Sequence, residues 1–583
     1  MSERAALLLK QLEKLIQDET EEQRDRMESQ WSLPLAERVR TGKAIEGLRF
    51  AGVNDRTGRL ILECQTNNSR FREGDYLFLH KGHPLLEPNV ECVLELDEEQ
   101  HLEMFPQGNA RRLLDDPEGW IADEGFMDLS GYYLEALREV ADRQIGRTRI
   151  LPLILGDISP EIDLASYERG WEAAFEGGLN ESQAEAVAQA YATDLVYLIQ
   201  GPPGTGKTLV LAHIARLLAE EGERVFVTAL THRAINNALN KIAEVASDLP
   251  VCKIGHPARA DGLAVENYDS FERSQFGQIA GGYIVGATPF STRTNRLCEV
   301  EFDTVLFDEA SQITLPLAIM GMLVGKRYVF IGDDRQLPPV TTLRNPYQLS
   351  KESIFGFLAG RGYEEMLTLT YRLNDRLTEW PSRTFYTNRL QPAPTVGERR
   401  LKLQAMSERW REILAPEHPA VFVDLYGRNT TVRSHREAEL VTDLVLALLQ
   451  SGIPPEEIGV VSPYRAQGRE IRNRLRRLVP EPDVHRAIVV DTVERMQGQE
   501  REVILVSLAT SSPAFAAELA DFFFQPQRLN VTITRPRTKL IIVGSSFVLR
   551  AEPEEPELVE WVELLRDLLQ SCTLHTLTYG EEF

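Results

Sequence analysis

Cysteine and long apolar runs are scarce in this chain of 583 residues. The five cysteines are scattered without a CxxC pair, which argues against a zinc site, an iron–sulfur cluster or a disulfide framework. No apolar stretch approaches the roughly 20 residues that a membrane-spanning helix needs. The first residues do not resemble a signal peptide. The composition therefore predicts a multidomain globular protein of the cytoplasm, with no membrane as its partner.

Positive charge is scarce as well. The chain has 64 Lys and Arg residues against 88 Asp and Glu residues, a formal net charge of -24. Because proteins that contact phosphates usually present a basic surface, this balance alone argues against a nucleic-acid partner. Net charge does not say where the basic residues lie, however, and a local groove of donors is enough to hold a strand. The charge is therefore only weak evidence against such a partner.

The pattern of apolar residues predicts four successive segments. Residues 5–30 have Leu and Ile at helical spacing, which indicates a long amphipathic helix. Short apolar runs separated by turns follow up to residue 151 and indicate a small β-barrel. Two series of apolar strands alternating with helices then predict two parallel sheets covered by helices. The expected domains are 1–43, 44–151, 152–345 with a small insertion near 255–280, and 346–583, which ends in a helix.

The strongest local signal is a glycine-rich segment. Residues 201–208 read Gly-Pro-Pro-Gly-Thr-Gly-Lys-Thr, follow the predicted strand 194–200 and open an apolar-periodic helix. This is a Walker A pattern in its required context, whereas a plain turn would leave the lysine unexplained. Backbone N–H groups can surround phosphate oxygens, the lysine can reach the terminal phosphates, and the threonine can bind Mg²⁺. The predicted ATP-binding residues here are Gly204, Thr205, Gly206, Lys207 and Thr208.

A pair of acidic residues completes the predicted phosphate chemistry. The apolar run 304–307 ends in Asp308 and Glu309. Two acids at a strand end are often only a solvated turn. Together with the upstream Walker A pattern, however, they predict one carboxylate for the metal and one for the attacking water. We assign Asp308 to Mg²⁺ and Glu309 to the general base.

These motifs resemble those of superfamily 1 helicases, and specifically the branch that includes Upf1, immunoglobulin mu-binding protein 2 and Dna2. The likeness covers about residues 179–545. Residues 179–183 are similar to the Q motif, which implies that Gln183 contacts the adenine. Residues 330–339 are similar to motif III, which implies that Gln336 senses the γ-phosphate. Residues 228–237 and 285–289 resemble two strand-binding motifs, whose candidate contacts are Thr231, Thr288 and Pro289.

The second α/β domain continues the resemblance. Segments 369–372, 491–500 and 528–535 are similar to motifs IV, V and VI. The resemblance implies that Arg372 and Arg535 act as arginine fingers, that Tyr371 packs on the adenine, and that Glu500 holds the ribose. A guanidinium group suits this task because it can donate two parallel hydrogen bonds to the negatively charged oxygens of a transferring phosphoryl group. Further strand contacts are expected from Pro463 and Thr492.

Two features of this half depart from the family or leave alternatives open. Pro536 follows the predicted finger, Arg535, where the family usually has alanine, so the local backbone geometry is in question. Helix 465–479 carries six arginines, which we interpret as distributed around several faces and therefore as a solvated surface rather than a nucleic-acid contact. Any one arginine of motif VI could also be a plain surface charge. The order of the motifs along the chain is what favours the functional interpretation.

The resemblance implies two tandem RecA-like P-loop domains of α/β class, preceded by a helical stalk and a barrel. It implies a minimal, monomeric motor that uses ATP and Mg²⁺ and moves 5′ to 3′ on single-stranded nucleic acid, with DNA slightly favoured over RNA and little sequence preference. Two alternatives stay open. One is a translocase that remodels nucleoprotein without separating strands, and the other is a nucleotide-gated scaffold. The motifs fix neither direction nor substrate, and the guiding role of the barrel is a hypothesis.

Overall fold

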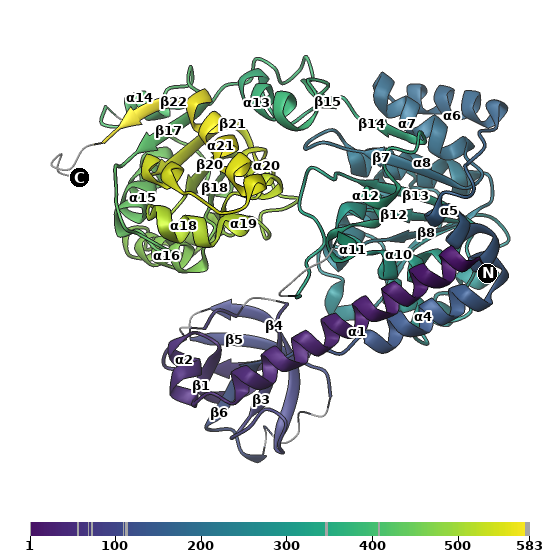
Figure 1. Ribbon diagram of the computed structural model, residues 1–583, viewed down its shortest axis with the longest axis horizontal. Coiled ribbons are helices and arrows are strands. Elements are labelled where there is room, and N and C mark those ends of the chain that lie inside the picture. The colour runs from purple at the N-terminus through teal and green to yellow at the C-terminus, as the bar shows by residue number, and fades with distance from the viewer. Residues whose placement is uncertain are drawn as a thin grey trace.

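The computed structural model describes residues 2–577, except 55–56, 68, 72–73, 99, 109, 111–112, 114, 344–347 and 406–407. Two α/β domains lie next to each other, and a small barrel lies below them at the end of a long helix (Figure 1). The predicted domain boundary between residues 345 and 346 falls outside the described residues. In the part of the chain that is described, no helix has the length and apolar character needed to cross a membrane.

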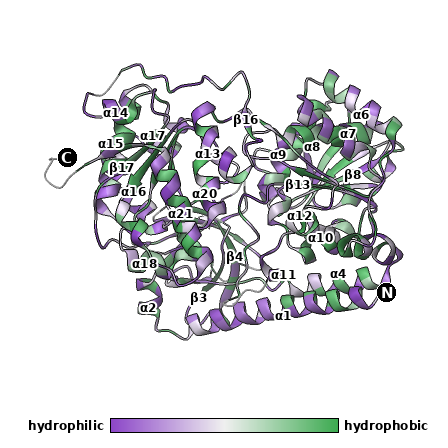
Figure 2. Cartoon of the chain, turned by 45° about the horizontal axis from the view of Figure 1, so that its top comes forward, coloured by the Kyte–Doolittle hydropathy of each residue, from purple (hydrophilic) through white to green (hydrophobic). Residues whose placement is uncertain are grey.

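The long helix is α1 (Glu3–Trp31), which connects the first α/β domain to the barrel. Ser2 caps its N-terminus by accepting a hydrogen bond from the Ala5 N–H. Buried residues of its N-terminal half, including Leu8 and Leu12, join the core of the first domain. At the other end the indole of Trp31 packs against Phe78 of the barrel. Figure 2 shows hydrophilic and hydrophobic residues alternating along this helix, as its amphipathic sequence predicts.

Six antiparallel strands form a closed barrel in the order β1-β2-β5-β4-β3-β6. They are β1 (Ala44–Val53), β2 (Leu60–Glu63), β3 (Tyr76–His80), β4 (Asn89–Glu98), β5 (His101–Pro106) and β6 (Trp120–Glu124), preceded by the short helix α2 (Leu35–Arg40). The sequence placed the barrel at 44–151, but its strands end at Glu124. The following residues form α4 (Ser130–Asp142), a π-helical turn (Gly146–Ile150) and α5 (Leu151–Leu155). Their apolar residues, such as Leu137 and Val140, pack against α1 and the first domain instead.

The first α/β domain is built on an eight-stranded parallel sheet in the order β10-β9-β11-β8-β12-β13-β7-β14. Its strands are β7 (Val196–Gln200), β8 (Arg224–Thr228), β9 (Val251–Ile254), β10 (Glu266–Tyr268), β11 (Tyr283–Gly286), β12 (Thr304–Phe307), β13 (Arg327–Gly332) and β14 (Glu364–Met366). Its main helices are α6 (Leu164–Glu176), α7 (Glu181–Ala192), α8 (Lys207–Glu220), α9 (His232–Val245) and α10 (Leu315–Met322). The apolar runs of the sequence correspond to β7, β8, β11, β12 and β13, whereas β9, β10 and β14 were not predicted.

One predicted boundary needs correction here. The sequence assigned everything after residue 345 to the second domain, yet β14 pairs with β7 in the first sheet. Ile354 and Phe355 of α12 (Ile354–Leu358) are buried in the first core as well. A short strand such as β14 carries too little periodicity to be read from the sequence, because its place is set by pairing with a distant strand.

The second α/β domain contains a six-stranded parallel sheet in the order β19-β18-β20-β21-β17-β22. Its strands are β17 (Ala420–Asp424), β18 (Ile458–Val461), β19 (Val489–Asp491), β20 (Arg501–Ser507), β21 (Pro536–Gly544) and β22 (Thr573–Thr576), of which the sequence missed only the last. Its main helices are α13 (Asp375–Phe385), α15 (His435–Gln450), α16 (Arg465–Leu478), α20 (Pro526–Ile533) and α21 (Pro556–Ser571). The shorter elements of the chain are α11 (Gln348–Lys351), β15 (Leu369–Thr370), β16 (Gln391–Pro392), α14 (Arg411–Leu414), α17 (Pro482–Ala487), α18 (Pro513–Glu518) and α19 (Ala520–Phe523).

Candidate nucleotide site and strand groove

The glycine-rich segment forms a tight loop between β7 and the start of α8 at Lys207. Gly204 and Gly206 adopt φ values of 75° and 84°, which side chains other than glycine rarely tolerate. Gly204 is also crowded, because a Cβ there would lie 2.4 Å from the Cβ of Arg372. The Lys207 Nζ folds back and donates to the Gly201 carbonyl at 2.5 Å. The loop thus places backbone donors at a helix N-terminus, as phosphate binding requires.

The predicted acidic pair lies at the carboxyl end of β12. Asp308 is only 6% exposed, and its carboxylate accepts a hydrogen bond from the Glu309 N–H at 2.9 Å. Burial, together with the neighbouring Glu309 charge, raises the pKa of Asp308 above its ordinary value. Strand β13 lies between β12 and β7, and Gln336 follows it. The phosphate loop, the acids and Gln336 therefore share one edge of the sheet, where α/β folds bind ligands.

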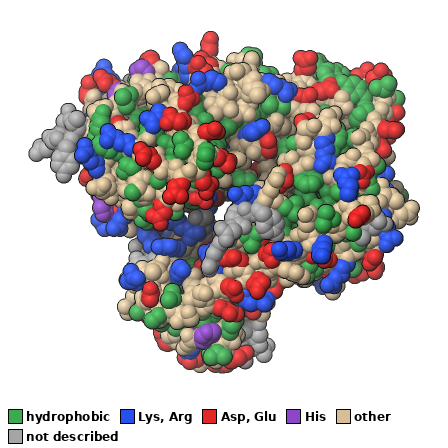
Figure 3. All heavy atoms as spheres, viewed as in Figure 1, with side chains coloured by type: hydrophobic (Ala, Val, Ile, Leu, Met, Phe, Trp, Pro, Cys, Tyr) green, Lys and Arg blue, Asp and Glu red, His purple; other side chains and the backbone are tan. Residues whose placement is uncertain are grey.

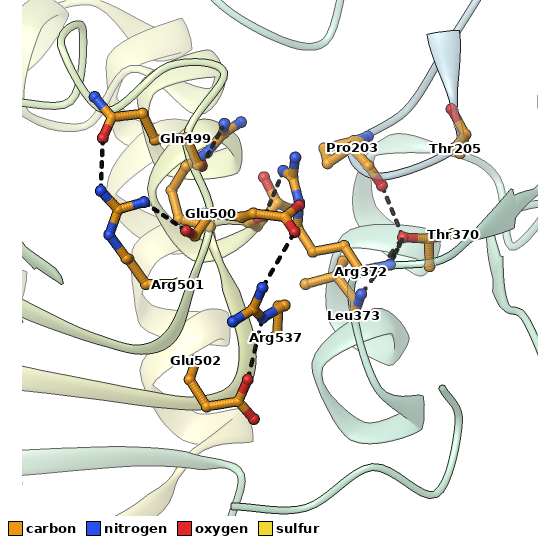
Figure 4. Close-up of polar contacts among 12 residues, drawn as sticks. Pro203, Thr205, Thr370, Arg372, Leu373, Gln499, Glu500, Arg501, Glu502 and Arg537 are labelled. Atoms are coloured by element: carbon orange, nitrogen blue, oxygen red, sulfur yellow. Dashed lines mark hydrogen bonds and ion pairs between the residues drawn. The ribbon is translucent and has the colours of Figure 1, made fainter. Parts of the chain in front are cut away.

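Both predicted arginine fingers reach this edge from the second domain's side of the cleft. Arg372 donates to the Glu500 carboxylate at 2.6 Å and to the Thr534 carbonyl at 3.1 Å, as Figure 4 shows for Glu500. Arg535 is 1% exposed and donates to the Gln336 side-chain oxygen at 3.4 Å. Its other acceptors are two backbone carbonyls. The structure thus brings Lys207, Glu309, Gln336 and both arginines together.

Arg535 is chemically unusual because its charge is buried and its hydrogen-bond acceptors are neutral oxygens. Burial and the nearby Arg372 charge lower its pKa to about 9. Burying a cation without a compensating anion is unfavourable unless a ligand supplies the anion. Two guanidinium groups converging beside a phosphate loop therefore form a candidate anion site, although Arg372 is paired with Glu500. Pro536 does not disturb it, since this proline opens β21, where a strand tolerates proline.

The residues predicted to contact the adenine flank the same loop. Gln183 donates to the Thr205 carbonyl at 3.0 Å and forms a capping box with Asn180 at the start of α7. The Tyr371 N–H donates to the Gly204 carbonyl at 2.8 Å, and its hydroxyl accepts from Asn180 at 2.9 Å. Tyr371 is 43% exposed, so its ring has a free surface. Glu500, predicted at the ribose, instead pairs with arginines, which outweigh the effect of burial and lower its pKa.

A hollow of about 790 Å³ separates the barrel from the first domain. Thr231 and Thr288, two of the predicted strand contacts, line it. Thr231 also caps the N-terminus of α9 by accepting a hydrogen bond from the Ala234 N–H, and His232 and Arg233 of the first turn line the hollow as well. Pro289 is buried next to Thr288 and does not line the hollow.

A second hollow, of about 720 Å³, lies between the barrel and the second domain. Thr492 lines it, while Pro463 is adjacent to the lining residue Tyr464. Figure 3 shows Lys and Arg side chains gathered beside this hollow. Basic residues that line it are Arg70 of the barrel, Arg465, Arg469, Arg472 and Arg476 of α16, and Arg486 and Arg495. Asp97 and Asp491 line it too, so the positive charge is partly balanced.

The expected solvated face of α16 needs correction. Four of its six arginines share one face, since residues 465, 469, 472 and 476 follow the spacing of i, i+4, i+7 and i+11. Arg477 is exposed and does not line the hollow. The prediction of scattered arginines is therefore wrong for these four, although their spacing in the sequence already contained this signal. We refer to these four residues below as the α16 arginine row.

Comparisons with known proteins identify the family of the chain. One family model described as AAA domain matches residues 178–278 and 267–343, and a second model with the same description matches residues 350–547. The DNA replication ATP-dependent helicase/nuclease DNA2 of Saccharomyces cerevisiae is 30% identical over 418 residues, which are 66% of this chain and 27% of that protein. An uncharacterized ATP-dependent helicase of Methanocaldococcus jannaschii is 26% identical, covering 74% of this chain and 77% of its own. The chain belongs to the Upf1/Dna2-like branch of superfamily 1 helicases.

The relatives of this helicase differ from it in length. The chain spans between 27% and 38% of the length of three DNA2 relatives. Among solved structures, the arterivirus nonstructural protein 10 helicase matches with 14% identity and a TM-score of 0.40, covering 91% of this chain and 82% of its own.

Sequence reasoning missed one group at the cleft of this helicase. Tyr386 and Asn530 are buried and connect to Asp333, which follows β13. Asp333 and Asn530 lie inside recognised motifs, but Tyr386 lies between motifs. Nothing in its local sequence identifies it, because its partners are 53 and 144 residues away.

Proposed function

We propose that this protein is an ATP-driven motor that separates strands of nucleic acid. The proposal rests on groups from both domains that meet at one cleft. The phosphate loop of the first domain and the buried Arg535 are brought to one cleft, and Gly204 leaves room for Arg372 to approach that loop. A γ-phosphate there would be held from both sides, so hydrolysis would change how strongly the two domains are held together.

Each residue of the cleft would have its own role in binding and hydrolysing ATP. Gln183 and Tyr371 would orient the adenine, and residues 204–208 would hold the phosphates. Glu309 would orient and deprotonate the attacking water. Gln336, Arg372 and Arg535 would stabilise the negative charge that spreads over the transferring phosphoryl group. Glu500 would exchange its arginine contacts for the ribose.

Mg²⁺ fits the donors that the cleft offers. Thr208 and Asp308 supply a hydroxyl and a carboxylate, the hard oxygen donors that this ion prefers. Among the described residues no group of three or more His, Cys, Asp and Glu side chains could hold a metal by itself. This agrees with an ion that takes most of its ligands from phosphates and water. When bound, Mg²⁺ would neutralise part of the phosphate charge.

The two hollows would form one path for a single strand. Thr231 and Thr288 would contact the strand from the first domain, with the buried Pro289 supporting Thr288, and Pro463, Thr492 and the α16 arginine row would contact it from the second domain. Opening and closing of the cleft would move one set past the other, while the barrel covers both hollows. Hydroxyls, guanidinium groups and backbone N–H groups bind phosphates without reading bases, so little sequence preference is expected. The family resemblance favours movement 5′ to 3′ by a monomer, and the DNA2 relatives favour DNA.

Strand separation on tailed duplexes tests this function. DNA and RNA duplexes carrying a 5′ or a 3′ single-stranded tail would be mixed with the protein, ATP and Mg²⁺. We expect separation only from the 5′ tail, and faster separation of DNA. Strand-stimulated ATP turnover without separation would favour a translocase that remodels nucleoprotein. Strand binding without turnover would leave the nucleotide-gated scaffold as the better account.

A further inference from the structure

A buried chain of hydrogen bonds crosses the cleft beside the nucleotide site. Tyr386, which follows α13, is 2% exposed, and its hydroxyl donates to the Asp333 carboxylate at 2.8 Å. Asn530 of α20 donates to the same hydroxyl at 2.8 Å. Asp333 follows β13 of the first domain, whereas α20 packs in the second domain. Tyr386 therefore bridges the two domains through one oxygen atom.

The direction of these hydrogen bonds is fixed by their partners. The Asn530 amide nitrogen also donates to the Arg335 carbonyl at 2.8 Å, and a carbonyl can only accept. The amide must therefore present hydrogen to the Tyr386 hydroxyl, whose own hydrogen is left for Asp333. Burial and the Asp333 charge raise the pKa of Tyr386 well above its ordinary value, so the phenol stays protonated and able to donate.

The chain of hydrogen bonds continues to the predicted phosphate sensor. The Asp333 oxygen that accepts from Tyr386 also accepts from the Gln336 amide nitrogen at 2.6 Å. With its nitrogen held there, Gln336 directs its oxygen to Arg535, which donates to it at 3.4 Å. This series of hydrogen bonds begins at Asn530 and returns to Arg535, five residues further along motif VI. Both its ends belong to the second domain, and its middle belongs to the first.

The backbone after Tyr386 supports a fixed position for its ring. Thr387 and Asn388 adopt φ values of 50° and 61°, although neither is glycine. Such residues are uncommon in this region and persist where surrounding contacts hold them. Here the Asn388 N–H donates to the Ser382 carbonyl of α13 at 2.9 Å. This turn closes the helix and leaves the Tyr386 ring directed at the cleft.

We propose that Tyr386 is a positioning residue that couples the nucleotide site to strand binding. Its hydroxyl holds Asp333, and through Asp333 it holds the Gln336 amide toward Arg535. The inference rests on the proposed function, since it concerns how strongly nucleotide and strand influence each other. If the domains separated, the Tyr386 hydroxyl could not keep both its contact with Asp333 and its contact with Asn530. The link therefore forms only when the two domains are together.

The test compares Tyr386→Phe with Tyr328→Phe. Tyr328 of β13 is fully buried, and its hydroxyl donates to the Gly325 carbonyl at 2.8 Å, so this variant also loses one buried hydroxyl but keeps the bridge. The kcat and KM for ATP would be measured with and without single-stranded DNA. Binding of a labelled oligonucleotide would be measured with and without a non-hydrolysable ATP analogue.

We expect Tyr386→Phe to lower strand-stimulated kcat about tenfold while KM for ATP changes less than about twofold. The analogue should also alter its oligonucleotide affinity less than it alters that of the wild type. Tyr328→Phe should behave as the wild type. Wild-type kcat and coupling in Tyr386→Phe would overturn the inference, as would equal losses in both variants with a lowered Tm, because those indicate packing alone. If the wild type itself showed no strand-stimulated turnover, the motor function would fail first, and the coupling role with it.

Discussion

The nucleotide cleft and the proposed strand groove of this protein are built in different ways. In the cleft, short contiguous motifs place buried groups at defined distances, such as the 1% exposed Arg535 beside Gln336. In the groove, the contacts come from a barrel, a helix and several loops around two open hollows. Phosphoryl transfer needs a fixed geometry, whereas binding a strand without reading its bases needs only donors along a path.

This difference explains the charge of the molecule. A net charge of -24 is compatible with the proposed strand binding, because seven arginines are concentrated along the second hollow. Part of that concentration is the α16 arginine row, which faces the barrel across a hollow.

The largest effect is expected from the cleft. Arg535→Ala should lower strand-stimulated ATP turnover about a thousandfold, because it removes charge stabilisation that is needed in the transition state. Oligonucleotide affinity without nucleotide should stay unchanged. The matched control is Arg376→Ala, on an arginine whose side chain is 67% exposed. Steady-state kinetics and a melting curve check this prediction. A fall in strand affinity equal to the fall in turnover would show that cleft and groove are not separate.

A smaller effect is expected from the groove. The double variant Arg469→Ala and Arg476→Ala should weaken oligonucleotide binding about tenfold, with ATP binding unchanged. The slope of log affinity against log salt should fall by about 0.7 for each phosphate that the variant no longer neutralises. Arg477→Ala is the matched control, because Arg477 lies on the same helix but is exposed and does not line the hollow. Equal losses in Arg477→Ala would rule out a specific path along the α16 arginine row.

The smallest effect concerns a buried carboxylate connected to α16, since Gln467 of that helix donates to the same Ser507 hydroxyl that donates to Glu437. Glu437 of α15 is buried, and its carboxylate accepts from Ser507 at 2.8 Å and from the Ala509 N–H at 2.7 Å. Burial raises its pKa from the ordinary 4.5 to about 7. Between these values the folded state binds more protons than the unfolded state, so stability is lost as pH rises from 4.5 to about 7.

Glu437→Gln removes this titration. The Tm of the variant should therefore fall less than the Tm of the wild type between about pH 5 and about pH 7. We expect the two falls to differ by a few degrees, which corresponds to about 1 kcal/mol of unfolding free energy. Glu439→Gln, on the same helix but with a side chain that is 42% exposed, should keep the wild-type dependence. Thermal melting at several pH values measures both. An unchanged pH dependence in Glu437→Gln would mean that this carboxylate does not titrate as its burial requires.

The sequence predicted most of the cleft and little of the groove. Lys207, Asp308 and Gln336 lie in motifs whose spacing follows from phosphate chemistry, and their roles stay predictions although the structure brings them together. The two sheets and α1 were predicted because apolar periodicity reports burial directly. Strands β9, β10, β14 and β22 were missed, since the places of such short strands depend on pairing with distant residues. Tyr386 could not be found for the same reason, because its function depends on contacts that only the folded chain creates.

In the proposed motor, a strand in the groove and hydrolysis in the cleft drive each other. The most direct measurement is ATP turnover by the wild type and by Glu309→Gln, each with and without single-stranded DNA or RNA. We predict that a strand raises wild-type turnover at least about tenfold, and that Glu309→Gln lowers the stimulated rate by about a hundredfold or more while ATP-dependent strand binding persists. Turnover that is indifferent to both nucleic acids, or that persists in Glu309→Gln, would contradict this account.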